Sequence, residues 1–223
     1  MPDALTRHWL SRGAAEAGVA QALRALAPRL AAVGAEPAVL ALVAKAIADE
    51  ERHAGICVEL AERYAKRSLA PRAPLEPLAP RGGTLPDFGT GDEALEVALL
   101  VLGMSCINES IACEWLRASY ARATDRAAAE VHRAHLKDEI DHARLGWAHF
   151  ASRAVSPALK AVIRERWVER VLAANVTEWQ KPDEHLPPEG VPELGHLSQA
   201  ESLEAIEAAV RDVIRPGLAR VGL

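Results

Sequence analysis

The 223-residue sequence predicts an all-α protein, and three observations lead to that expectation. Half of the residues are hydrophobic but only 4% are aromatic, and Ala and Leu dominate the apolar part. Both residues lose little conformational freedom in a helix, whereas the β-branched residues that favour strands are under-used. Apolar residues recur with helical periodicity over most of the chain, and the breaks between the periodic stretches carry Gly, Pro or capping residues. We expect a single domain over residues 1–223.

Five breaks divide the chain into six expected helices. Gly34 can close the first helix in a left-handed conformation, and Pro37 can open the second. Because Pro and Gly do not continue a helix, the segment 69–92, which is rich in both, is expected to be a long connection. Thr124 or Asp125 suits the N-cap of the fourth helix. The expected helices span about 5–33, 38–67, 93–123, 125–153, 157–178 and 199–218.

The connections between the first four expected helices are short, long and short. This order is typical of two antiparallel hairpins joined by a crossover. The sequence therefore predicts a four-helix bundle with one long connection over about residues 5–153. Two additional helices would form a C-terminal extension over about residues 156–223.

Charge, cysteine content and the lack of targeting segments limit the partners and the cellular compartment that we expect for the protein. The net charge of −5 provides no basic face for phosphates, which argues against a nucleic-acid partner. The three cysteines form no CxxC pair, so we expect no disulfide framework and a reducing compartment. The N-terminus lacks the apolar segment of a secretion signal, and no uninterrupted run of eighteen apolar residues predicts a membrane span. These features favour a cytoplasmic protein.

One short pattern occurs twice: residues 48–54 read ADEERHA and residues 137–143 read KDEIDHA. In a helix, residues i and i+3 lie on one face, so Glu50 can converge with His53, and Glu139 with His142. Both pairs lie on the apolar stripe of their helix. Two carboxylates and two imidazoles facing a core are costly to bury without partners, and a metal ion supplies such a partner.

The spacing alone is not specific. A third Glu-x-x-His, Glu193 to His196, occurs in the Pro-rich loop and shows how easily the pattern arises by chance. The alternative for the two helical copies is a set of ion-paired core residues without metal. Placement on an apolar helix face is what distinguishes the two helical copies from the loop copy.

The two remaining helices of the expected bundle each offer one carboxylate on their apolar stripe, Glu16 and Glu109. Residues equally far from a hairpin turn stand level in a bundle. Glu16 and Glu50 have their midpoint at residue 33, and Glu109 and Glu139 have theirs at residue 124, which are the positions of the two short connections. Glu from two helices and Glu-x-x-His from two others is the ligand set of dinuclear carboxylate sites in bundles, and mixed carboxylate and imidazole ligands suit iron or manganese.

These motifs resemble those of the ferritin-like di-iron carboxylate superfamily, including a group of bacterial ferritin-like proteins. The resemblance covers roughly residues 10–153 and rests on the segments EAGVA, DEERHAGIC, CINESIA and DEIDHARLGW. It implies two bound metal ions, most simply Fe/Fe, with Fe/Mn and Mn/Mn left open. The residues that would ligate them are Glu16, Glu50, His53, Glu109, Glu139 and His142.

The same resemblance implies a role for the Asp that precedes each motif glutamate, Asp49 and Asp138. In related bacterial multicomponent oxygenases this Asp hydrogen-bonds the metal-ligating His of the opposite helix. Here that implies pairs of Asp49 with His142 and of Asp138 with His53, which would fix the imidazole tautomer and raise ligand basicity. The alternative is that both are ordinary exposed charges.

Other polar side chains on the same stripes are candidates for a pocket next to the metals. Cys57, Cys106 and Cys113 lie within about one turn of His53 or Glu109, although small core hydrophobes are the simpler interpretation. His135 precedes Glu139 by one turn and could be a further ligand or lie behind the ligands. The remaining histidines look incidental: His8, His132, His149, His185 and His196.

The sequence leaves three functions open. The first is an oxidoreductase that uses O₂ to oxidise or oxygenate a small organic substrate, with an electron donor as a further partner. The small residues Gly103, Ser105, Cys106 and Ala112 near Glu109 would leave room for such a substrate. The second is a ferritin-like iron-handling protein: a ferroxidase, an iron store or a peroxide scavenger. The long Pro-rich segments of this chain fit poorly into a compact cage. They therefore favour the enzyme, which would be a monomer or a homodimer. The third is a binding or scaffold role without catalysis.

Overall fold

The computed structural model describes residues 2–66 and 87–223, and throughout these ranges the regular structure is helical, with no β-strand. This confirms the all-α class expected from the sequence. Most of the expected long connection at 69–92 lies outside the described residues. The α-helices are α1 (Pro2–Ala32), α2 (Pro37–Ala65), α3 (Glu93–Val101), α4 (Glu109–Arg122), α5 (Arg126–Ala151), α6 (Pro157–Arg166), α7 (Val168–Trp179), α8 (Gln199–Ala208) and α9 (Arg215–Val221). Two π-helical segments, η1 (Leu102–Asn108) and η3 (Ala209–Ile214), and a 3₁₀ turn, η2 (Pro192–Leu194), complete them.

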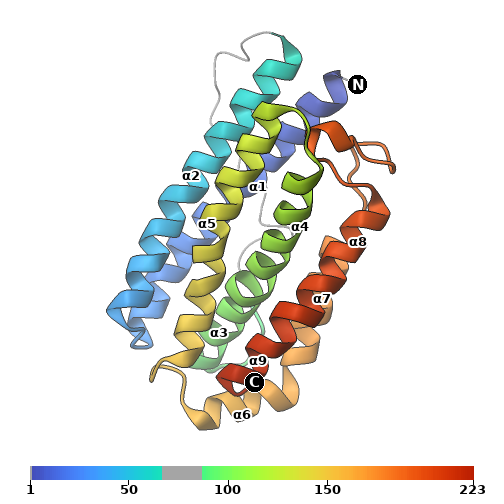
Figure 1. The fold of residues 1–223 in the computed structure, drawn as a ribbon. Helices are drawn as coiled ribbons and strands as arrows, with labels where there is room; N and C mark the ends of the chain where they lie inside the picture. Colours follow the sequence, from blue (N-terminus) through green and yellow to red (C-terminus); the bar gives the residue numbers. More distant parts are fainter. Residues whose placement is uncertain (1, 67–86) are drawn as a thin grey trace.

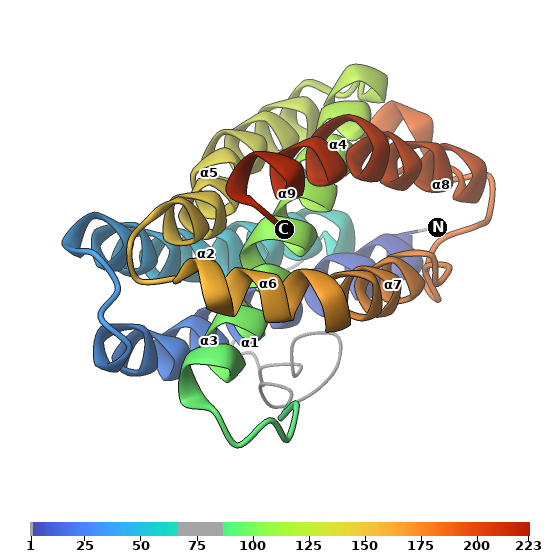
Figure 2. The same ribbon diagram turned by 90° about the horizontal axis from the view of Figure 1, so that it is seen from below.

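Four long helical segments run side by side: α1, α2, α5 and the continuous segment formed by α3, η1 and α4 (Figure 1). Helix α1 packs on α2, α2 packs on α5, and α5 packs on α4 and η1. The C-terminal helices cover this group on one side (Figure 2). There α6 contacts α3, α7 contacts η1, α8 contacts α4, and α9 contacts α5.

The short connections end where the sequence places helix-breaking and capping residues. Gly34 has a φ of 78°, a left-handed conformation that costs glycine little, and Pro37 opens α2. Asp125 caps α5, because its carboxylate accepts a hydrogen bond from the backbone N–H of Ala128. Ser156 caps α6 in the same manner. Local side-chain chemistry therefore fixes the lengths of the helices that carry the polar residues of the bundle interior.

The structure differs from the expected helices in three places. The helix expected at 93–123 contains the π-helical segment η1. The helix expected at 157–178 breaks at Trp167, where the backbone leaves the helical region and the indole ring packs edge-on against Phe88, 5.6 Å between centroids. The last helix continues to Val221 and contains η3. Pro216 follows η3, has no backbone N–H for the carbonyl four residues earlier, and so disturbs the regular helix there.

A continuous apolar core joins the bundle to the C-terminal helices. It contains buried residues of α1, α2, α3, η1 and α5 together with residues of α6 to α9, such as Ile163, Leu172 and Ile206.

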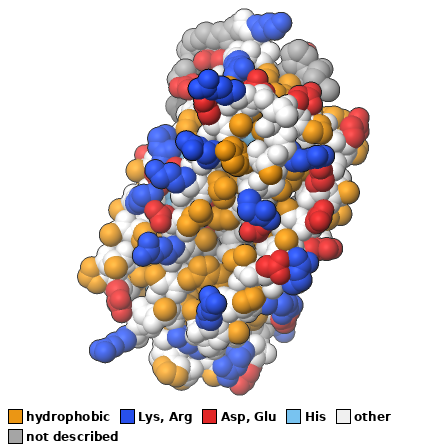
Figure 3. Space-filling view, viewed as in Figure 1, with side chains coloured by type: hydrophobic (Ala, Val, Ile, Leu, Met, Phe, Trp, Pro, Cys, Tyr) orange, Lys and Arg blue, Asp and Glu red, His pale blue; other side chains and the backbone are white. Residues whose placement is uncertain are grey.

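The segment Glu93–Arg122 is long and apolar enough to cross a membrane by length and composition alone, and 72% of its most apolar window is buried within the protein. Core helices of soluble proteins pass the same test. Over the face seen in Figure 3, basic and acidic side chains are interspersed, with hydrophobic side chains between them.

Close approach of α5 to η1 requires a glycine. A Cβ atom added at Gly146 would lie 2.6 Å from the Sγ of Cys106, 2.8 Å from its backbone nitrogen and 2.9 Å from the Cβ of Ser105. Gly103 lies on another side of η1, where an added Cβ would be 3.4 Å from Val171 and from Asn175 in α7. The small residues expected to leave room for a substrate thus serve close helix packing at these contacts.

We expect Gly146→Ala to destabilise the protein by about 1–3 kcal/mol, because the new methyl group overlaps the η1 backbone. Chemical unfolding followed by circular dichroism measures the change. Gly55→Ala is the matched control, since Gly55 lies in α2 with no described atom within 4 Å of an added Cβ. It should stabilise by about 0.5–1 kcal/mol, because alanine is the better helix former. Similar effects of the two substitutions would contradict a close α5–η1 contact at Gly146.

Candidate metal centre

Carboxylate and imidazole side chains from four helical segments converge between the bundle helices. They form two groups of four, and within each group one oxygen or nitrogen atom per residue lies within 4.8 Å of all the others. Glu50 and Glu139 belong to both groups. Two adjacent groups of ligand atoms that share two carboxylates could hold two metal ions with bridging glutamates. The groups are Glu16, Glu50, His53 and Glu139, and Glu50, Glu109, Glu139 and His142.

Helix register explains why these residues meet. Glu16 and Glu50 lie equally far from the α1–α2 turn, and Glu109 and Glu139 lie equally far from the α4–α5 turn. The π-helical segment η1 ends directly before Glu109, so the helix between Glu109 and the turn is regular and the spacing is undisturbed. All six residues expected from the sequence are therefore brought together.

The two imidazoles direct the same type of nitrogen toward the carboxylates. The Nδ1 atom of His142 is 2.6 Å from Oε2 of Glu139 and 3.1 Å from Oε1 of Glu50. The Nδ1 atom of His53 is 3.6 Å from Glu139 and 3.7 Å from Glu50. These four residues are at most 3% exposed, so water contributes little to their solvation.

Burial and crowding shift the pKa values in this space in opposite directions. Burial and the charge of Glu139 raise the pKa of Glu50 well above its usual value, and the same two causes raise the pKa of Glu109. Burial would also raise the pKa of Glu139, but its hydrogen bond to His142 lowers it. Burial would lower the pKa of His142, yet hydrogen bonds to Glu139 and Glu50 raise it to about 12. Protons thus provide the positive charge that this set of carboxylates requires.

Both motif aspartates lie against the histidine of the opposite helix. The Nε2 atom of His53 is 3.3 Å from Oδ2 of Asp138, and the Nε2 atom of His142 is 3.4 Å from Oδ2 of Asp49. This is the crosswise arrangement anticipated from the sequence. With Nε2 held by an aspartate, each ring directs Nδ1 toward the carboxylates, and a metal ion bound there would take the place of the Nδ1 proton.

Two basic residues hold these aspartates in place. Lys45 contacts Asp49 at 2.6 Å and Asp138 at 3.8 Å, and Arg52 contacts the same two at 2.5 and 3.0 Å. Burial would raise the pKa of Asp49, but hydrogen bonds from Lys45 and Arg52 lower it, so the carboxylate stays ionised. These two basic residues were not among those predicted from the sequence. Their spacing from Asp49, i−4 and i+3 on the same helix, was a readable signal.

Arg12 is a further residue that sequence reasoning missed. Its Nε atom is 3.2 Å from Oε1 of Glu16, and its guanidinium lies 5.2 Å from the Trp115 ring centroid. The i,i+4 spacing of Arg12 and Glu16 on one helix was the signal available. The aromatic ring and the carboxylate together fix the Arg12 side chain, which therefore holds Glu16 in position at the edge of the centre.

The pocket candidates have different surroundings. Cys57 and Cys106 are buried and Cys113 is only partly buried. Burial raises the pKa of all three thiols, so none is a thiolate near neutral pH. The His135 ring is fully buried and stacks on His53, with 4.2 Å between the ring centroids. Burial keeps His135 neutral by lowering its pKa well below the usual value.

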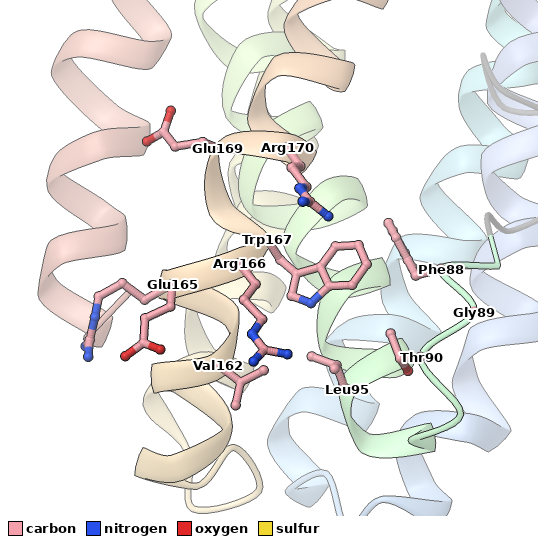
Figure 4. A pocket seen from close by; sticks show the side chains of 11 residues that line it. Phe88, Gly89, Thr90, Leu95, Val162, Glu165, Arg166, Trp167, Glu169 and Arg170 are labelled. Carbon is pink, nitrogen blue, oxygen red and sulfur yellow. The ribbon is translucent and has the colours of Figure 1, made fainter.

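A separate cavity of about 700 Å³ lies between α6–α7 and the residues before α3, away from the candidate ligands. Figure 4 shows Trp167 facing Phe88, with Arg166 and Arg170 nearby. None of its lining residues belongs to either group of candidate metal ligands.

Comparison of the chain with protein-family models, with curated proteins and with solved structures gave no match. The chemistry open to the centre therefore follows from its own side chains.

We expect Asp138→Ala to weaken metal binding at the centre by roughly 10- to 100-fold, because His53 would lose the group that orients it. Titration with Mn²⁺, with free Mn²⁺ measured by electron paramagnetic resonance, gives the affinity. Asp141→Ala is the matched control, because Asp141 shares the contact with Lys45 but has no recorded contact with a histidine among the described residues. An equal loss in both variants would show a general charge effect.

Proposed function

We propose that the protein is a ferritin-like, dinuclear non-haem metalloenzyme that uses O₂ to oxidise or oxygenate a small organic substrate. One observation carries this proposal: two groups of potential ligands share Glu50 and Glu139. A centre with two metal positions and shared carboxylates is the arrangement found in bundle proteins of the di-iron carboxylate type. The all-helical fold supports it. So do the two short turns, which place each pair of glutamates at the same height along neighbouring helices.

The donor set fits two divalent ions. When ionised, the four glutamates carry four negative charges, which two divalent cations would balance in a space with little water. Two imidazoles complete the set, and the three thiols of the chain stay protonated because burial raises their pKa values. Oxygen and imidazole donors without thiolate suit iron or manganese. Fe/Fe is the pair we propose, with Fe/Mn and Mn/Mn as outcomes of metal analysis.

The side chains around the donors have separate tasks in this proposal. Bound ferrous ions would supply the electrons and the open coordination positions that O₂ activation requires. Asp49 and Asp138 orient the imidazoles, and Lys45 and Arg52 keep both aspartates in place. The apolar helices around the centre exclude water, which protects reactive species from side reactions.

We expect anaerobically purified protein to bind two Fe²⁺ per chain. Glu50→Ala or His142→Ala should abolish at least one of these sites, because Glu50 belongs to both groups of ligands and His142 belongs to one of them. Glu193→Ala is the control: Glu193 has the same spacing to a histidine, but its side chain is exposed in η2. Iron analysis after desalting gives the stoichiometry. Fewer than two Fe²⁺ in the wild type, or equal loss in all variants, would defeat the proposal.

Addition of O₂ to the Fe²⁺-loaded protein separates an enzyme from an iron-handling protein. An enzyme should consume O₂ repeatedly when reductant and substrate are supplied, with iron remaining bound at two per chain. Accumulation of ferric mineral in a many-subunit cage would favour storage instead. Size-exclusion chromatography with light scattering measures the assembly, and an oxygen electrode measures the turnover.

A further inference from the structure

Three buried imidazoles converge at the end of the bundle where the chain starts. His8 comes from α1, His132 from α5 and His196 from the connection between α7 and α8, and their exposed fractions are 7%, 1% and 1%. Figure 1 shows this connection beside the first turns of α1 and the α4–α5 turn. The ring centroids of His8 and His196 are 4.5 Å apart, and those of His132 and His196 are 6.3 Å apart.

Two of these rings are oriented by oxygen atoms behind them. The Nδ1–H of His8 donates to Oδ2 of Asp183 at 2.6 Å, and the Nε2–H of His132 donates to the carbonyl oxygen of Leu194 at 3.0 Å. Each neutral ring then carries a lone pair on its other nitrogen, Nε2 of His8 and Nδ1 of His132. Both nitrogens are buried and have no hydrogen-bond partner among the residues that the structure describes. Metal-ligating imidazoles are typically held by a carboxylate or a backbone carbonyl in this manner.

His196 is the third member and is held by its backbone rather than by its ring. Its backbone pairs with Val191 in both directions, 2.9 and 3.2 Å between nitrogen and oxygen. Both ring nitrogens are buried and lack a hydrogen-bond partner within the described ranges. Its position is thus fixed by the backbone, while neither ring nitrogen is committed to a described hydrogen-bond partner.

We propose that His8, His132 and His196 form a mononuclear site for a divalent transition metal ion, with Zn²⁺ as the ion that best fits three neutral imidazoles. Three imidazoles bound at about 2.0–2.1 Å would place their ring centroids roughly 5 Å apart, which lies between the 4.5 and 6.3 Å observed for the two pairs that include His196. Three nitrogen ligands leave the fourth tetrahedral position open. This site is separate from the carboxylate centre and does not depend on the function proposed above.

Charge and conformation define what binding requires. Asp183 supplies negative charge behind His8, and the nearby positive charge of Arg12 is balanced by Glu16. Over residues 2–66 and 87–223, three ligand atoms lie within 4.8 Å of one another only in the two carboxylate groups. Metal binding at the histidine cluster therefore requires the three imidazoles to come closer together than they lie in this structure. A bound ion would satisfy the buried lone pairs, which are otherwise costly.

Zinc titration against a chromophoric chelator tests the site. Wild-type protein should bind one more Zn²⁺ per chain than His196→Ala, and His8→Gln should show the same loss. His149→Ala is the matched control, because His149 is 1% exposed and also has a buried nitrogen without a described partner. It should bind as many ions as the wild type. Equal numbers in wild type and His196→Ala, or an equal loss in His149→Ala, would overturn the proposal.

Glu50→Ala separates this site from the carboxylate centre. It should lose metal at that centre and keep the ion that His196→Ala loses. Addition of Co²⁺ to the Glu50→Ala protein should give the intense visible absorption of tetrahedral nitrogen ligation, without any change to a histidine. Absence of that absorption would contradict the site even where the histidine variants fail to fold.

Discussion

The structure depends on one electrostatic constraint: four glutamates meet between the helices, and two of them, Glu50 and Glu139, are at most 3% exposed. Such carboxylates cannot all stay ionised without positive charge close by, and the opposite pKa shifts of Glu50 and Glu139 express this. Positive charge comes from two places. At the centre, protons or metal ions neutralise the glutamates. Around it, Arg12, Lys45 and Arg52 pair with the carboxylates that lie toward the surface. The order of the layers follows: ligands inside, then orienting aspartates, then basic residues at the rim.

Much of the fold and of the candidate centre could be predicted from the sequence, because the residues that end the helices and set their register act locally. Gly34, Pro37 and Asp125 end or begin helices through their own backbone and side-chain chemistry. Once the turns are placed, counting residues levels Glu16 with Glu50 and Glu109 with Glu139, and the structure brings the oxygen atoms of these levelled pairs together. The alternation of short and long connections between helices indicated which segments are paired.

What the sequence did not indicate depends on contacts between distant segments. The π-helical segment η1 packs closely on α5 at Gly146 and on α7 at its own Gly103. No sequence pattern within residues 102–108 predicts a π-helix there. The break at Trp167 reflects packing on Phe88. His196 looked incidental because its loop carries no helical periodicity, yet tertiary contacts bring it to His8 and His132. Contacts between segments far apart in the chain leave no signal in local spacing.

The polar residues of α5 also explain why the bundle carries additional helices. His132, His135, Glu139 and His142 follow the spacing of a single helix face, so α5 turns polar groups inward over much of its length. It contributes only Leu145 and Phe150 to the buried part of the main apolar core. The missing apolar burial is supplied elsewhere, by α3 and η1, which are buried on nearly every side, and by α6 to α9, which pack on α3, η1, α4 and α5. A bundle with so many buried polar groups needs this second layer, because hydrophobic burial is the main term that stabilises the fold.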